Sequence, residues 1–215
     1  MRAAGIPYDV QYADIDYLER QLDFVLDSQF QGLPALVDSM RGEGMRFIFI
    51  LDPAISANET TPYSAFDRGV EDDVFIKWPK ELSNDIVWGK VWPDLPGVVV
   101  NESVDWETQI EIYRSFAAFP DFFMHRTAEW WHREISNFYE KIMKFDGLWI
   151  DMNEPSSFVH GTVGEKCLGP PVYDNPPYMP RKSTHTFIKT VTPLSKHSHF
   201  HQDTHLHQDT HTFIK

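Results

Sequence analysis

The first 180 residues of this chain predict an α/β fold, because strand patterns and helix patterns alternate along them. Apolar residues make up 42% of the 215 residues and charged residues 24%, a composition typical of a chain that folds around a core. One predicted strand, residues 46–51, is continuously apolar from Phe47 to Leu51, as expected of a parallel strand buried on both faces. These observations favour a parallel sheet covered by helices.

The predicted elements begin with a strand, a helix and a second strand. Residues 10–16 predict a short strand that ends in a carboxylate. Apolar side chains recur at helical spacing over 32–40, so a helix is predicted there before the strand 46–51. Residues 56–123 are rich in proline, glycine, aspartate and tryptophan, and they are too long for a plain connection. They predict an insertion that lines a site.

Helical spacing returns at 127–139, where Thr127 is the predicted N-cap, and 145–150 predict a third strand. The three strands end in Asp16, Asp52 and Asp151. Any one of these acids alone could be a helix cap or a turn former. Right-handed strand–helix–strand units, however, bring the carboxyl ends of their strands to one rim. We therefore expect the three carboxylates to converge on one pocket.

The C-terminal segment 181–215 differs from the rest and predicts a disordered tail. It holds seven of the ten histidines, and the six residues 184–189 recur as 210–215. Such low-complexity sequence buries too little apolar surface to offset its ordering entropy. The domain is therefore expected to span 1–180. Alternating histidines within 197–207 leave a zinc or nickel site open as an alternative, although no acid or cysteine completes a fixed site.

The charge and cysteine content argue against several classes of protein. A net charge of −13 disfavours binding to nucleic acids and to anionic membranes. The single cysteine, Cys167, excludes an internal disulfide framework and a thiolate metal cluster. No run approaches about eighteen apolar residues, so neither a membrane segment nor a signal peptide is expected in this chain.

Clustered carboxylates with many aromatic residues suit two kinds of chemistry. Asp16, Asp52 and Asp151 could hold magnesium or calcium, which prefer oxygen ligands. Tryptophans favour glycoside cleavage instead, because their rings can stack on sugars, although they could equally fill the core. In that reaction one carboxylate attacks the anomeric carbon or activates water, and Asp151 is the candidate because a strand end is rigid. The relevant tryptophans are Trp78, Trp88, Trp92, Trp106 and Trp149.

The run Trp149-Ile150-Asp151-Met152-Asn153-Glu154, continued by Pro155-Ser156-Ser157-Phe158, resembles the nucleophile signature of the retaining α-glucosidases of glycoside hydrolase family 31. The earlier blocks that match, in order, are Ile6-Pro7-Tyr8-Asp9-Val10 with Asp14-Ile15-Asp16-Tyr17, Ile50-Leu51-Asp52-Pro53-Ala54-Ile55, and Val91-Trp92-Pro93-Asp94. The resemblance covers residues 3–180 and is strongest to the intestinal enzymes of the family.

This resemblance implies a partial (β/α)8 barrel, about strands 2–4, with the insertion after the third barrel strand. It implies hydrolysis of terminal α-1,4-linked glucose from maltose and malto-oligosaccharides by double displacement, without a cofactor or metal. By match to the motif, Asp151 would be the nucleophile and Asp52 would hydrogen-bond glucose hydroxyls, while Glu154 would anchor its loop. The other expected substrate contacts are Trp92, Trp149, Ile150, Met152 and Asp16.

The resemblance also implies that the acid/base aspartate of the family lies beyond the matched residues, so the chain alone is expected to be inactive. Two alternatives stay open. The chain could be a non-catalytic carbohydrate-binding remnant that keeps Asp52, or it could be the product of a truncated transcript. Asn58 and Asn101 begin N-glycosylation sequons. They fit a secreted or lumenal parent, and the resemblance implies a membrane-anchored or secreted parent at the extracellular face of the intestinal brush border.

Overall fold

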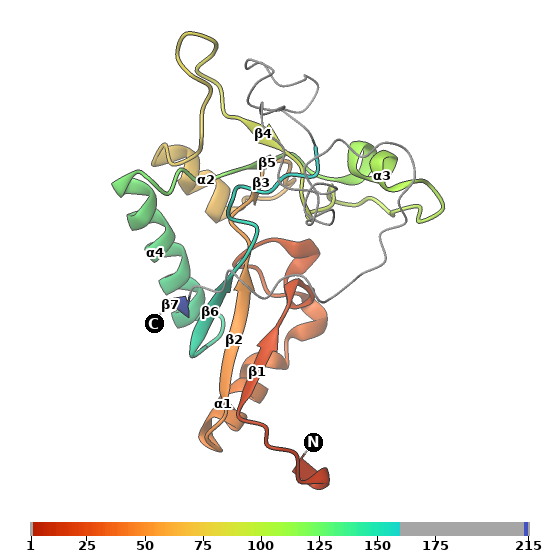
Figure 1. Cartoon of the computed structure of the whole chain (residues 1–215), viewed down its shortest axis with the longest axis vertical. Helices are drawn as coiled ribbons and strands as arrows, with labels where there is room; N and C mark the ends of the chain where they lie inside the picture. The colour runs from red at the N-terminus through yellow and green to blue at the C-terminus, as the bar shows by residue number, and fades with distance from the viewer. Residues whose placement is uncertain (1, 160–212, 215) are drawn as a thin grey trace, which may run out of the picture.

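The computed structural model describes residues 2–159 and 213–214, whose strands form two sheets (Figure 1). The larger sheet has the order β1 (Val10–Ala13), β2 (Arg46–Leu51), β6 (Gly147–Ile150) and β7 (Phe213–Ile214). The smaller sheet has the order β3 (Ile55–Ser56), β5 (Ala117–Ala118) and β4 (Trp88–Gly89). Strands β1, β2 and β6 are parallel, whereas β7 is antiparallel to β6. The predicted α/β class with a parallel sheet is confirmed.

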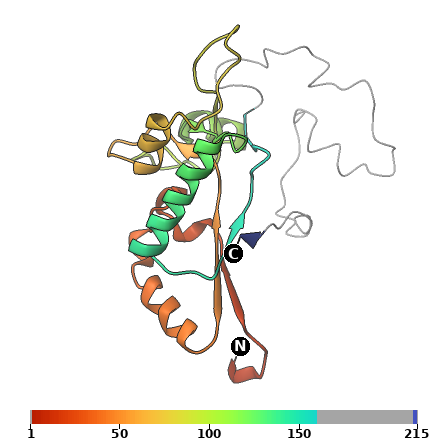
Figure 2. The same cartoon turned by 90° about the vertical axis from the view of Figure 1, so that its left-hand side faces the viewer.

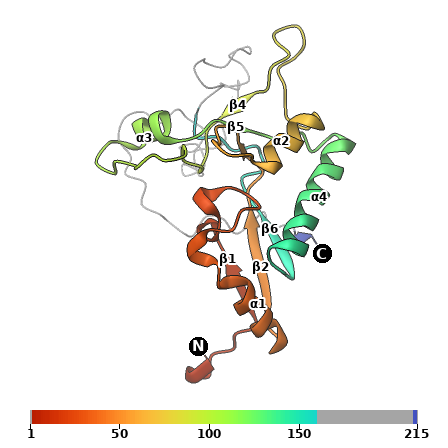
Figure 3. The ribbon, with the colours of Figure 1, turned by 180° about the vertical axis from the view of Figure 1, so that it is seen from behind.

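Two helices cover one face of the parallel strands. Helix α1 (Leu33–Gly42) connects β1 to β2, and α4 (His125–Lys141) precedes β6. Figures 2 and 3 show both helices on the same side of the sheet. Consecutive strand–helix units arranged in this way present the carboxyl ends of their strands at one edge.

The segment between β2 and α4 is not a plain loop. It contains the smaller sheet and two further helices, α2 (Ser64–Glu71) and α3 (Trp106–Tyr113). Figure 1 shows these elements beyond the carboxyl ends of the parallel strands. Arg68 of α2 forms a bidentate ion pair with the buried Glu134 of α4, at 2.8 and 2.5 Å. The insertion is thus fastened to the helix that leads into β6.

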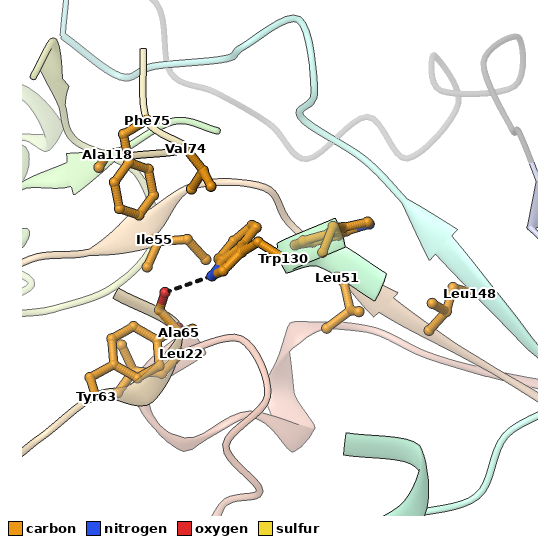
Figure 4. Packing of buried hydrophobic residues seen from close by; sticks show 11 residues of the cluster. Leu22, Leu51, Ile55, Tyr63, Ala65, Val74, Phe75, Ala118, Trp130 and Leu148 are labelled. Atoms are coloured by element: carbon orange, nitrogen blue, oxygen red, sulfur yellow. Dashed lines mark hydrogen bonds between the residues drawn. The ribbon is translucent and has the colours of Figure 1, made fainter. Parts of the chain in front are cut away.

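The core extends from the sheet into the insertion, as Figure 4 shows. Trp130 of α4 is fully buried, and its indole Nε1–H donates a hydrogen bond of 3.2 Å to the carbonyl oxygen of Ala65. The same cluster contains Leu51 at the end of β2 and Leu148 in β6. Because one cluster joins these elements, the ends of β2 and β6 have a rigid support.

Several element boundaries differ from the prediction. The strand predicted over 10–16 ends at Ala13, because the side chain of Asp14 accepts the Ile15 N–H at 2.8 Å and begins a short 3₁₀ helix. Thr127 is not the N-cap of α4, since the helix begins at His125 after Met124. The buried hydroxyl of Thr127 instead donates to the carbonyl oxygen of Val74.

The remaining boundaries agree more closely. The strand 46–51 has its predicted bounds. The helix predicted over 32–40 begins one residue later and continues to Gly42. The strand predicted over 145–150 begins at Gly147, because the Asp146 carboxylate binds the Phe47 N–H and Arg41 instead. Three other short 3₁₀ helices are Arg2–Ala4, Glu19–Gln21 and Ser28–Phe30.

The predicted tail, its histidines and Cys167 lie outside the described residues, apart from Phe213 and Ile214, which form β7. The division into 1–180 and 181–215 and the disorder of the tail therefore stay predictions. Within the described part of the chain, no helix is long and apolar enough to cross a bilayer.

Candidate active site

Two of the predicted site residues, Asp52 and Asp151, directly follow neighbouring parallel strands. Leu51 of β2 lies opposite Ile150 of β6 in the sheet register, and each aspartate is the next residue along its strand. Asp52 is buried, with 8% of its surface exposed, and Asp151 is half-buried. The sheet therefore brings these two carboxylates to the same edge, as the sequence predicts.

Asp52 lies in a buried, acidic environment. Burial, followed by the charges of Asp151, Asp14 and Glu154, raises its pKa to about 7. Its Oδ1 atom is buried and has no hydrogen-bond partner among the described residues. A carboxyl group in this state can accept a hydrogen bond when ionised and donate one when protonated.

Asp16 does not have the position that the predicted strand would give it. The register of β1 and β2 pairs Ala13 with Phe49, so a longer strand would have placed Asp16 beside Asp52. Instead the chain turns after Ala13, and Asp16 is exposed on the 3₁₀ helix. The carboxylate from this segment that acts on the pKa of Asp52 is that of Asp14.

Met152 connects Asp151 to an aromatic group. Its N–H donates to Asp151 Oδ1 at 2.9 Å, and its sulfur accepts the Trp92 Nε1–H at 3.0 Å. Trp92 meets the Phe158 ring edge to face, with ring centroids 4.7 Å apart, and the Trp106 ring at 6.2 Å. The backbone of Met152 has a φ of 55°, which is uncommon for a residue other than glycine. Asp151 and Trp92 are therefore placed together through one strained residue.

The two strand residues before Asp151 are less directly placed at this site. Trp149 packs against the cluster that contains Phe49 and Ile50, and Ile150 is half-buried at the strand end. The structure thus brings Asp52, Asp151, Met152 and Trp92 to one region. Trp149 and Ile150 lie next to that region because they directly precede Asp151 in the sequence.

Sequence reasoning missed two residues that hold these groups. The Arg114 guanidinium donates to the carbonyl oxygen of Trp92 at 2.5 Å and to Asp94 Oδ1 at 2.8 Å, and it lies 6.0 Å from the Trp92 ring centroid. Asp23 is buried and accepts the Asp52 N–H. The sequence offers one signal for Asp23, namely an acid between two apolar residues. It offers no signal for Arg114.

The two sequon asparagines have different surroundings. Asn58 Oδ1 accepts hydrogen bonds from the Phe116 N–H at 2.6 Å and the Ser115 hydroxyl at 3.2 Å. Asn101 is exposed, and its Oδ1 accepts the N–H of Ser103 at 3.0 Å. The side chain of Asn58 therefore helps to hold the insertion together, whereas that of Asn101 forms a local turn at the surface.

The alternative of a magnesium or calcium site requires the carboxylates of Asp16, Asp52 and Asp151 to gather around one point, because both ions prefer several oxygen ligands. Among the described residues, no group of three His, Cys, Asp or Glu side chains is placed to hold a metal ion. Asp16, Asp52 and Asp151 thus do not form such a group.

Comparisons with known proteins point to one family. Residues 1–214 match the family model for the glycosyl hydrolases family 31 TIM-barrel domain. The chain is 60% identical over 186 residues to intestinal sucrase-isomaltase of Oryctolagus cuniculus, covering 86% of this chain and 10% of that protein. It is 59% identical over 186 residues to human probable maltase-glucoamylase 2, covering 84% of this chain and 7% of that protein. The similarity expected to intestinal enzymes is confirmed.

Solved structures show the same fold. The glucosidase II alpha subunit in its DNJ-bound form superposes with a TM-score of 0.56 at 24% identity, over 74% of this chain and 14% of that chain. A family 31 alpha-glucosidase from Bacteroides thetaiotaomicron gives a TM-score of 0.55 at 24% identity, over 75% of this chain and 23% of that chain. The chain spans about a tenth of the length of its intestinal sucrase-isomaltase relatives. By its family match and its identity to these relatives, the chain belongs to glycosyl hydrolase family 31.

Proposed function

We propose that this chain supplies part of the glucose site of a retaining α-glucosidase that acts on terminal α-1,4-linked glucose of maltose and malto-oligosaccharides. The observation that carries the proposal is the position of Asp52 and Asp151, each directly after the register pair Leu51 and Ile150. Membership of family 31 supports it, as does similarity to proteins named sucrase-isomaltase, maltase-glucoamylase and lysosomal alpha-glucosidase.

Asp151 is the nucleophile in this proposal. One carboxylate oxygen attacks the anomeric carbon of glucose and forms a β-glucosyl ester, while the bond to the leaving oxygen breaks and that oxygen takes a proton from the acid/base aspartate that the family resemblance implies beyond the matched residues. Water then gives a proton back to the same acid/base group and attacks the same carbon, which releases glucose with its original configuration and restores the Asp151 carboxylate. Asp151 Oδ1 already accepts the N–H of Met152, which fixes the direction of the group and leaves the other oxygen for attack.

Asp52 binds glucose hydroxyls in this proposal. Its Oδ1 is buried and lacks a partner among the described residues, so a sugar hydroxyl would satisfy an atom whose burial is otherwise costly. Hydrogen bonds to a carboxylate are stronger than those between neutral groups. The contact therefore contributes both affinity and orientation.

The apolar neighbours of these acids pack around the sugar ring. Trp92 lies against Met152, whose N–H binds the Asp151 carboxylate, so these two residues form the wall of the site next to the nucleophile. Trp149 and Ile150 complete the wall from the strand. Asp16, which is exposed, contacts the substrate from outside this wall.

Covalent labelling tests the proposal. An activated fluoroglucoside or a cyclitol epoxide needs little acid assistance, so Asp151 is expected to form an ester with either reagent in the 215-residue chain. Peptide mass spectrometry locates the label. Asp151→Asn should abolish it, whereas Asp38→Asn, a matched change on the exposed surface of α1, should leave it intact. Glucose binding without any label would favour the non-catalytic carbohydrate-binding remnant instead.

The parent protein is proposed to reside at the extracellular face of a membrane or in a secretory compartment. The sequons at Asn58 and Asn101 support this location, because N-glycans are added to proteins that pass through the secretory route. Four of the relatives are named as intestinal sucrase-isomaltase, which supports the same assignment.

A further inference from the structure

Asp23 is a buried acid that has no part in the proposed reaction. It is 2% exposed, and it precedes Asp52 by 29 residues in the sequence. Its Oδ1 accepts the main-chain N–H of Asp52 at 3.2 Å, and its Oδ2 is buried without a hydrogen-bond partner among the described residues. Burying a carboxyl group is costly, so its retention at this point needs a reason.

The loop that carries Asp23 has an unusual backbone. Arg20, Gln21 and Phe24 have positive φ angles of 48°, 59° and 68°, a region that favours glycine. The Glu19 N–H donates to the carbonyl oxygen of Val25 at 2.9 Å and closes the loop. Strained conformations of this kind persist only where the surroundings determine them, and they gather at functional sites.

Contacts from α4 and from two points in the insertion hold this loop. The Phe24 ring packs edge to face on Trp131 of α4, with centroids 5.5 Å apart. The Tyr63 hydroxyl donates to the carbonyl oxygen of Asp23 at 3.0 Å. Arg20 donates to the carbonyl oxygen of Asp94 in the insertion at 2.7 Å. The position of Asp23 is therefore fixed from several sides.

The contact with Asp52 falls where the sheet ladder stops. Leu51 is the last residue of β2, so the ladder offers no partner for the next N–H. The Asp23 carboxyl group accepts that N–H inside the protein. Because the N–H and the side chain of Asp52 share one Cα, fixing the first restricts the direction of the second.

We propose that Asp23 is a positioning residue of the glucose site, whose carboxyl oxygen holds the backbone of Asp52 and thereby directs the Asp52 carboxyl group at the sugar. This inference rests on the proposed function. Burial, followed by the charge of Asp52, raises the pKa of Asp23 well above its ordinary value. Asparagine, which is uncharged and keeps the acceptor oxygen, therefore reproduces the protonated side chain closely.

Three variants of the 215-residue chain test this role. Asp23→Asn keeps the acceptor, Asp23→Ala removes it, and Asp27→Ala is the matched control, because the Asp27 side chain accepts the Gln29 N–H on the same segment. The Asp52 amide should exchange with deuterium about tenfold faster in Asp23→Ala, as loss of one hydrogen bond predicts, and at the wild-type rate in the other two. NMR reads the exchange of this single amide.

Labelling of Asp151 by the activated fluoroglucoside gives the second readout. In Asp23→Ala the concentration for half-maximal labelling should rise about tenfold while the limiting rate changes less than about twofold, because binding to Asp52 is affected and attack by Asp151 is not. Asp23→Asn should restore wild-type behaviour. If Asp23→Ala does not fold, Asp23→Leu, which fills the volume without an acceptor, takes its place with the same expectations.

The outcomes separate the inference from the proposed function. Unchanged exchange of the Asp52 amide in a folded Asp23→Ala or Asp23→Leu chain would overturn the positioning role, as would an Asp23→Asn chain that is equally impaired. If wild-type Asp151 takes no label, the proposed function fails. In that case faster amide exchange would still show that Asp23 holds Asp52, and an unchanged rate would refute both.

Discussion

Asp52 and Asp151 occupy equivalent positions on neighbouring parallel strands, each one residue beyond the register pair of Leu51 and Ile150. Their proximity raises the pKa of Asp52 in addition to the effect of burial. Two acids so placed differ in environment, since Asp52 is buried and Asp151 is half-buried. In the proposed function, that difference suits Asp52 to hold the sugar and Asp151 to attack it.

Asp52→Asn should change how stability depends on pH. The folded-state pKa of about 7 exceeds the ordinary value of 3.8, so the folded chain binds the proton more tightly than the unfolded chain. The resulting stability is present below about pH 4 and is lost as the pH rises to about 7, by at most roughly 4 kcal/mol. Urea unfolding at pH 4, 6 and 8 should give a shallower decline for Asp52→Asn than for wild type. Parallel curves would contradict the raised pKa.

Arg68→Met should destabilise the chain by about 2–3 kcal/mol, because it removes the bidentate partner of the buried Glu134 carboxylate and leaves it only the longer contact with Arg133 Nε at 3.5 Å. Arg126→Met is the matched control. Its pair with Asp73 is about half exposed on both sides and should contribute less than about 1 kcal/mol. Denaturant unfolding of both variants measures the difference. Equal losses of unfolding free energy in the two variants would show that the α2–α4 ion pair stabilises the chain no more than the exposed pair does.

Gly69→Ala should destabilise the chain by about 1–3 kcal/mol, because a Cβ at this position would lie 2.5 Å from Cζ of Phe75. Gly42→Ala at the end of α1 meets no atom within 4 Å and should be neutral or stabilising by about 0.4–1 kcal/mol. Thermal melts report both changes. A neutral Gly69→Ala would mean that α2 does not pack on Phe75 as described.

Asn101 should accept an N-glycan more completely than Asn58 when the chain is expressed through a secretory route. Asn101 is exposed, whereas the Asn58 side chain is already bound to Phe116 and Ser115. Glycopeptide mass spectrometry measures occupancy at each site. Asn58→Gln should also lower the melting temperature more than Asn101→Gln, and the reverse order in either experiment would be evidence against the structural role of Asn58.

The sequence predicts the framework well where one physical requirement dominates. The strand predicted over 46–51 is apolar from Phe47 to Leu51, and such a run is buried from water when it forms a central strand. Its predicted bounds agree with those of β2. The carboxylates Asp52 and Asp151 follow from strand ends, which parallel topology places at one edge.

Local hydrogen bonds limited the prediction elsewhere. Asp14 caps a 3₁₀ helix and ends the first strand early, so Asp16 is exposed rather than beside Asp52. Thr127 has a side chain suited to an N-cap, yet its buried hydroxyl donates to the carbonyl oxygen of Val74 in the insertion. The role of Asp23 depends on a loop with positive φ angles, which its residue types do not reveal.

Titration of the Asp52 carboxyl carbon by NMR tests the central arrangement most directly. We expect an apparent pKa of about 7 in the wild-type chain and a lower value in Asp151→Asn, because one neighbouring negative charge is removed. Asp16→Asn serves as the control and should leave the value unchanged. A pKa near 4 in the wild-type chain, or one that Asp151→Asn does not alter, would show that the two carboxylates do not share a site.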